Sequence, residues 1–294
     1  MPTIVRVKDN VAVITNTDFF SLVDFAKERT SALELDQQAS RHRRANKDKA
    51  FFGSATFEEA YTLAERGDHE LAKLVAITGE AMYERMSNLV VKPMPYYSDD
   101  PGITFDVERV IEGDPECYLH IEDIVKSGQG RSIVRLIFNA TSDAAISDSV
   151  IKAKGATVAS LVMMLENSGC GVEVVMYMGT QGAGKNAKRA EIYTTVKQAD
   201  QPIHILTLAF ALAHPATLRR FGFAELESLP LDFLAGIKIP GSYGFPSEAT
   251  HRGDVYVPSS RFGALNWADP KLAQKWVIDQ LREQGINLRE DALP

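Results

Sequence analysis

The stretch from residue 131 to residue 178 constrains the fold more than any other part of this 294-residue chain. Residues 131–138 (RSIVRLIF) are apolar and β-branched, which is typical of a strand buried on both faces. Residues 149–167 keep apolar side chains at helical spacing, and residues 172–178 (VEVVMYM) predict a second strand. A strand, a helix and a strand in this order need a right-handed crossover, so we expect the two strands to pair in parallel.

The later part of the chain extends this unit into an α/β fold. We expect a doubly wound, mostly parallel sheet of four to six strands, with 131–138 in its centre and helices on both faces. Four further elements follow the unit: an edge strand at 191–197, a helix at 206–221, a short strand at 253–257 and a last helix that begins at Asp269 and Pro270.

The first hundred residues differ in character, because helical patterns dominate them. Residues 3–15 predict one short strand, and prolines between residues 92 and 102 predict a linker. We therefore expect two parts: a mostly helical region, residues 1–100, packed against an α/β domain, residues 101–294. The predicted helices of the first part are 19–30, 56–66 and 69–88.

Composition narrows the classes of function. The net charge of −7 argues against wrapping of nucleic acid over the whole surface. The two cysteines, Cys117 and Cys170, form no CxxC pair, so neither a disulfide framework nor a zinc knuckle is expected. The N-terminus lacks an apolar signal-peptide core, and no apolar run is long enough to cross a bilayer. We expect a cytoplasmic protein of a bacterial host, or one associated with a virion, without membrane contact.

Residues 179–186 (GTQGAGKN) fit the pattern of a phosphate-binding loop, with Gly179, Gly184 and Lys185 as candidate nucleotide-binding residues. Two features weigh against this interpretation. Asn186 stands where a Ser or Thr hydroxyl would hold magnesium, and a strand-like segment follows in place of the helix whose amides would bind phosphate. We expect a hairpin loop, and no ATP hydrolysis that depends on Lys185.

The loop after the first buried strand is the candidate metal site. Asn139, Thr141 and Asp143 carry oxygen atoms at the carboxyl end of that strand, where ligands gather in open α/β sheets. Ser259, from the end of a later strand, is a further candidate ligand. A single carboxylate compensates Mg²⁺ poorly for the water it sheds, so we expect no cofactor beyond a weakly bound Mg²⁺. The alternative is a polar loop that caps the next helix.

A basic run near the N-terminus is the candidate nucleic-acid site. Its side chains Arg41, Arg43, Arg44 and Lys47 have the charge to contact phosphates. Aromatic residues that would stack on bases are not interleaved with them, and such a run is more often a solvated charged face or a mobile loop. The six histidines show no metal-binding spacing, and no GxSxG motif occurs. An enzyme is therefore less expected than a binding protein.

The order of elements from Arg131 onward resembles the von Willebrand factor A domain. That family has a doubly wound sheet with one antiparallel edge strand, and a metal site of the pattern Asp-x-Ser-x-Ser directly after the first strand. The matching positions here are Asn139, Thr141 and Asp143. Because Asn replaces the leading Asp and both serines are changed, the resemblance implies an A-like fold with a degenerate metal site.

The chain also resembles an uncharacterised family encoded by phages, plasmids and bacterial chromosomes. The segments that carry this resemblance are 52–60, 113–116, the Asn139 loop and 213–221. It implies a protein of a mobile element and assigns no activity. We therefore expect a non-enzymatic structural or interaction protein that binds an unidentified protein partner. A replication or packaging factor that binds nucleic acid is one alternative, and a nucleotide- or metal-dependent enzyme is the other.

Overall fold

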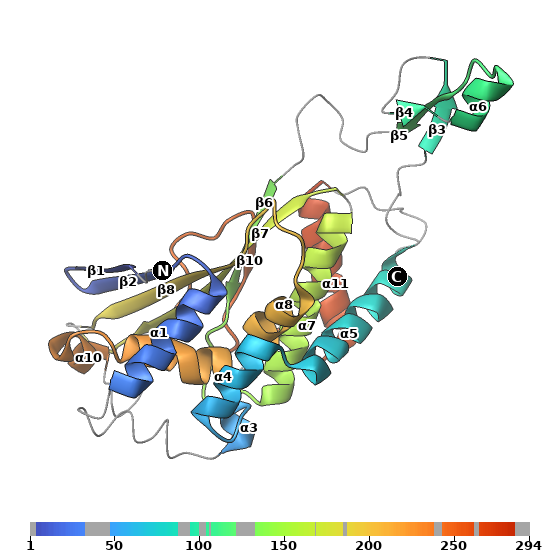
Figure 1. Ribbon diagram of the computed structural model, residues 1–294. Coiled ribbons are helices and arrows are strands. Elements are labelled where there is room, and N and C mark those ends of the chain that lie inside the picture. The colour runs from blue at the N-terminus through green and yellow to red at the C-terminus, as the bar shows by residue number, and fades with distance from the viewer. Residues whose placement is uncertain are drawn as a thin grey trace.

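The computed structural model describes most of the chain, and the strands and helices below lie within that part (Figure 1). The described residues are 4–32, 48–87, 95–99, 104–105, 107–121, 133–167, 169–184, 187–237, 243–261 and 265–285.

A mixed sheet forms the centre of the molecule, so the chain has the α/β fold that the sequence predicts. Its strand order is β1-β2-β8-β7-β6-β10, and β9 pairs with β7. The pairs β6–β7, β6–β10 and β2–β8 are parallel, whereas β1–β2, β7–β8 and β7–β9 are antiparallel, so the sheet is mixed rather than mostly parallel. The seven strands are β1 (Ile4–Lys8), β2 (Val11–Asn16), β6 (Ile133–Asn139), β7 (Gly171–Gln181), β8 (Arg189–Lys197), β9 (Phe245–Pro246) and β10 (Val255–Val257).

The strand–helix–strand unit and the hairpin are both confirmed. β6 leads through α7 (Asp148–Asn167) into β7, and the two strands pair in parallel, with Val134 opposite Val172. β7 then turns back into β8 through the glycine-rich loop, and those two strands are antiparallel. β6 lies between β7 and the edge strand β10, so it is next to the edge of the sheet rather than in its centre.

The N-terminal segment changes the role of β8. Residues 4–16 form two strands rather than one, joined by a turn at Asp9, whose φ of 53° is left-handed. β2 pairs in parallel with β8, so the prediction of an edge strand at 191–197 is wrong, because an N-terminal strand covers that edge. Residues 4–16 therefore share one sheet with the part expected to be a separate α/β domain.

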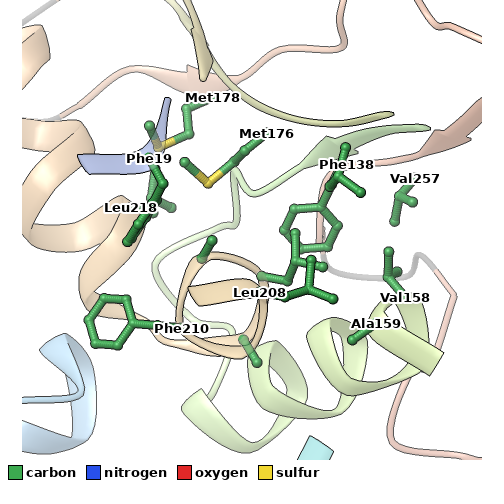
Figure 2. Packing of buried hydrophobic residues seen from close by; sticks show 14 of the residues in the cluster. Phe19, Phe138, Val158, Ala159, Met176, Met178, Leu208, Phe210, Leu218 and Val257 are labelled. Carbon is green, nitrogen blue, oxygen red and sulfur yellow. The ribbon is translucent and has the colours of Figure 1, made fainter. Parts of the chain in front are cut away.

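Helices cover one face of this sheet. Strand residues such as Phe138 and Met176 point into a core with Val158, Leu208 and Phe210 (Figure 2). The helices of this layer include α1 (Phe19–Ala32), α4 (Phe57–Arg66), α5 (His69–Ser87), α7, α8 (Ile205–Ala213), α9 (Phe223–Leu226), α10 (Leu231–Ile237) and α11 (Pro270–Glu283).

The other face is different, and the expectation of a doubly wound sheet is not met in the described residues. Here Ile137, Val175 and Tyr177 pack against Ala249, which belongs to an irregular segment between β9 and β10. This irregular segment takes the place of the second helix layer. Its side chains and backbone form hydrogen bonds with the polar groups of this face.

The predicted helix 206–221 is interrupted. α8 ends at Ala213, and a π-helical turn, η1 (Thr217–Gly222), follows. Pro215 explains the break, because it has no N–H to continue the helical hydrogen bonds and disfavours helical backbone in the residue before it. Upstream of the break, α8 crosses α7 so closely that a Cβ on Gly155 would lie 2.4 Å from the Cα atom of Ala213.

Two segments distant in sequence pack together at η1. The guanidinium of Arg220, 0% exposed, donates from Nε to Ser54 Oγ (2.7 Å) and from Nη2 to Ser54 O (2.8 Å). Arg219 donates to Phe51 O (2.7 Å) and lies over the Phe51 ring. Both arginines thus fasten the segment around α3 (Lys49–Phe52) to the core.

A second, smaller sheet lies in the region where the sequence suggested a linker. It has the order β3-β5-β4, and both pairs are antiparallel. Its elements are β3 (Pro95–Ser98), β4 (Thr104–Phe105), α6 (Val107–Glu112) and β5 (Tyr118–Ile121). Pro95 is the first residue of its strand, a position that tolerates the missing N–H. None of the helices described is both long and apolar enough to span a membrane.

Candidate functional site

The carboxyl ends of β6, β7 and β10 lie at one edge of the sheet, because these three strands are parallel. Side chains from this edge form a connected hydrogen-bond network that we call the strand-end cluster. Its members are Asn139, Glu248, Tyr256, Ser259 and Arg261.

Asn139 is the buried centre of the cluster, with 0% of its surface exposed. Its amide nitrogen donates to Ser247 O (3.0 Å), to Glu248 Oε2 (3.2 Å) and to Tyr256 Oη (3.2 Å). Its amide oxygen accepts from the Thr141 backbone N–H (3.0 Å). The asparagine side chain therefore holds the loop and the neighbouring strand together through bonds within the protein.

Glu248 supplies the carboxylate of the cluster. Its oxygens accept from Ser259 Oγ (2.5 Å) and from Tyr256 Oη (2.6 Å), and Arg261 Nη2 lies 3.4 Å away. Burial acts to raise the pKa of Glu248, but the hydrogen bonds from Ser259 and Tyr256 outweigh it and hold that pKa below its usual value. Burial, with the hydrogen bond to Glu248, also raises the pKa of Tyr256 to about 12. Glu248 is thus an anion at neutral pH.

Lys154 places a buried amino group beneath the same edge. It projects from α7, is 2% exposed, and donates from Nζ to Asn139 O (2.6 Å) and to Pro258 O (2.6 Å). Burial lowers the pKa of Lys154 to about 7, and the charge of Glu248 opposes this effect. The Lys154 amino group therefore bridges the carboxyl ends of β6 and β10.

A small cavity lies beside Lys154. Its lining includes Phe138, Lys154, His214, Thr217 and Ser260, and its volume is about 10 Å³. This is room for about one water molecule, far below the few hundred Å³ of a typical ligand pocket. Burial lowers the pKa of His214 to about 4, against the opposing charge of Asp68, so this imidazole is neutral at pH 7.

All four candidate metal ligands lie at this edge of the sheet. Asn139 and Ser259 belong to the strand-end cluster, and Thr141 Oγ1 accepts from the Gly179 backbone N–H (2.8 Å). Asp143 follows in the loop, where its backbone N–H donates to Ser260 O (2.9 Å). Within the described ranges, no group of three or more His, Cys, Asp or Glu side chains is gathered so that it could hold a metal ion.

The remaining candidate residues lie elsewhere. Gly179 is inside β7, and Gly184 belongs to the turn between β7 and β8, with a φ of 96°. Lys185 lies outside the described residues. The same holds for the candidate nucleic-acid residues Arg41, Arg43, Arg44 and Lys47.

Sequence reasoning missed Glu248 and Lys154. Glu248 is 109 positions from Asn139, and no local pattern connects the two. Lys154 did carry a signal, because it stands four residues from both Val150 and Val158 in a helix, on the apolar stripe. A lysine in that stripe predicts a buried ammonium with internal acceptors.

Further bonds clamp the segment between β9 and β10 onto the sheet. Arg189 donates to Glu248 O and to Tyr177 Oη (3.3 Å), and its guanidinium is paired with Glu191 (2.5 Å). Thr250 Oγ1 donates to Glu191 Oε1 (2.9 Å). The segment that carries Glu248 is therefore fixed from two sides.

Two members of the cluster, Glu248 and Arg261, reach the solvent, and with the exposed Phe245 they form what we call the strand-end surface. Phe245 is 57% exposed, and the Arg261 and Glu248 side chains are 44% and 31% exposed. Arg261 Nη2 donates to Pro246 O (2.5 Å), which places the guanidinium beside the strand that bears Phe245. The Arg261–Glu248 pair is therefore tied to the backbone of the strand that carries the exposed Phe245.

Comparison with known proteins gives one finding. A family model described as a domain of unknown function (DUF7192) matches residues 5–288. No curated protein and no solved structure matches the chain.

Proposed function

This chain belongs to that family of unknown function, and from the site alone we propose that it is a non-enzymatic protein-binding module that docks its partner on the strand-end surface. The observation that carries the proposal is the exposed Phe245 in β9, next in sequence to Pro246, whose carbonyl accepts from Arg261. Aromatic and arginine side chains dominate the binding energy of protein interfaces. A base that is already ordered lowers the entropy cost of association.

The proposal requires no metal ion. The Lys154 amino group already binds Asn139 O and Pro258 O, where the strand ends meet, so these two oxygens already have a hydrogen-bond donor. The carboxylate oxygens of Glu248 already accept hydrogen bonds from the hydroxyl groups of Ser259 and Tyr256. We therefore propose that internal hydrogen bonds do here what a bound Mg²⁺ does in a metal-dependent adhesion site.

The likeness to a von Willebrand factor A domain is part of the proposal. It is supported by the strand order β8-β7-β6-β10, in which β8 alone runs antiparallel to the other three. Against it stand the pairing of β2 with β8 and the single helix layer of the described part. The assembly of a phage or another mobile element is the setting we propose, on the likeness of the segments named above.

The test is a comparison of partner capture by matched variants. The purified chain and its variants Phe245→Ala and Arg261→Ala are each immobilised and exposed to lysate of the native host. We expect the wild type to retain one set of proteins. Both variants should retain at least tenfold less of each of these proteins. Leu272→Ala, which removes a 41%-exposed side chain from α11, is the control and should retain the same proteins.

Two outcomes contradict the proposal. Equal capture by all four proteins would show that the strand-end surface does not bind the partner. Capture of nucleic acid that falls steeply with salt concentration, with no effect of the two substitutions, would favour the alternative of a nucleic-acid-binding factor.

A further inference from the structure

The outer side of β1 is a second surface that the strand-end surface does not explain. β1 is the last strand in the order of the main sheet, and in the described part of the chain only β2 pairs with it. Its outer row of backbone N–H and C=O groups faces away from the sheet. Such a row is a template for another extended chain.

Two valines make this edge apolar on the helix-covered face. Val5 and Val7 lie directly opposite Ile14 and Ala12 on β2, and so point to the same face of the sheet. Ile14 and Ala12 are 0% exposed, whereas Val5 is 45% and Val7 is 48% exposed. The difference arises because α1 packs over β2 and β8, so the helix layer described here stops one strand short of β1.

Two cations occupy the opposite face of the same strand. Arg6 and Lys8 are exposed and alternate with the valines. A second copy of the chain is a poor occupant, because an antiparallel pairing of all five residues sets Arg6 opposite Arg6, and like charges directly opposite destabilise a sheet. An acidic strand has the complementary charge.

We propose that β1 accepts an extended segment of a partner protein in which acidic and apolar residues alternate, added antiparallel as a further strand of the sheet. The backbone of the segment bonds to the outer edge of β1. Its apolar side chains cover Val5 and Val7, and its carboxylates face Arg6 and Lys8. This proposal is independent of the strand-end surface.

The experiment uses the full chain and two fluorescein-labelled peptides, one with Glu and Val in alternation and one with Lys and Val. Binding is measured by fluorescence polarisation for the wild type and for the double variant Arg6→Glu/Lys8→Glu. We expect the Glu–Val peptide to bind the wild type and to bind the variant at least tenfold more weakly. The variant should gain binding of the Lys–Val peptide, because the charge pattern is reversed.

The double variant Lys271→Glu/Lys275→Glu makes the same change of charge on the exposed side of α11 and is the matched control. It should bind both peptides as the wild type does. The proposal is overturned if the wild type does not bind the Glu–Val peptide, if the control weakens that binding equally, or if the Lys–Val peptide gains nothing. A dimer in light scattering that dissociates on Val7→Asp would also overturn it, since a second copy would then occupy the edge.

Discussion

Glu225 makes the stability of this protein depend on pH. It lies in α9 with 0% of its surface exposed, and among the described residues neither carboxylate oxygen has a partner in hydrogen-bonding geometry. Burial raises the pKa of Glu225 to about 8, and the nearby amide of Asn16 offsets only part of this. The side chain is therefore a neutral acid in the folded protein at pH 7.

The sign and size of the effect follow from linkage. The pKa of Glu225 is higher in the folded than in the unfolded protein. The protonated carboxyl therefore contributes its full share to the stability of the fold below the unfolded pKa, and this contribution is lost as pH rises through about 8. Each unit of pKa difference is worth about 1.4 kcal/mol, so the loss between pH 4.5 and pH 9 is roughly 4–5 kcal/mol. In Glu225→Gln this contribution disappears, and the free energy of unfolding should fall less between pH 5 and pH 9 than in the wild type.

Urea denaturation at pH 5, 6, 7, 8 and 9 measures this difference. The stability of Glu225→Gln relative to wild type should rise steadily up to about pH 8 and then level off. Glu283→Gln, at the exposed end of α11, is the control and should follow the wild-type profile. If the profiles of wild type and Glu225→Gln are parallel, the carboxyl of Glu225 is not held neutral and the reasoning is refuted.

Three other outcomes follow from the packing and the cluster. Gly155→Ala should lower the free energy of unfolding by about 2–3 kcal/mol in urea denaturation, because the added methyl overlaps the backbone of α8. Arg220→Lys should cost about 2 kcal/mol and speed proteolysis near Ser54, since an ammonium cannot reproduce the forked bonds of the guanidinium. Millimolar Mg²⁺ should leave the wild-type Tm unchanged. Asn139→Asp should lower Tm, because it places a second carboxylate beside Glu248, and Mg²⁺ should restore part of that loss. Asn139→Ala should also lower Tm, but Mg²⁺ should restore none of that loss.

Local patterns in the sequence were enough to find the elements whose identity depends on neighbours along the chain. The period of apolar residues predicted β6, α7 and β7, and the glycine-rich loop predicted the β7–β8 hairpin. Asp269 and Pro270 marked the start of α11, where Asp269 Oδ1 accepts from the Lys271 N–H (2.9 Å). Each of these signals lies within one turn or one strand of the feature that it determines.

Tertiary structure alone decided which strands and side chains meet. No pattern in the sequence of β2 predicts that this strand pairs with β8, which lies more than 170 residues away. Nor does the sequence state that Glu248 comes to Asn139 across 109 positions, or that Lys154 Nζ binds the ends of two different strands. The physical reason is that contacts between distant segments cost much chain entropy, which the burial of a whole sheet face offsets. The free energy of that burial depends on the complete fold, so no local period of side chains predicts it.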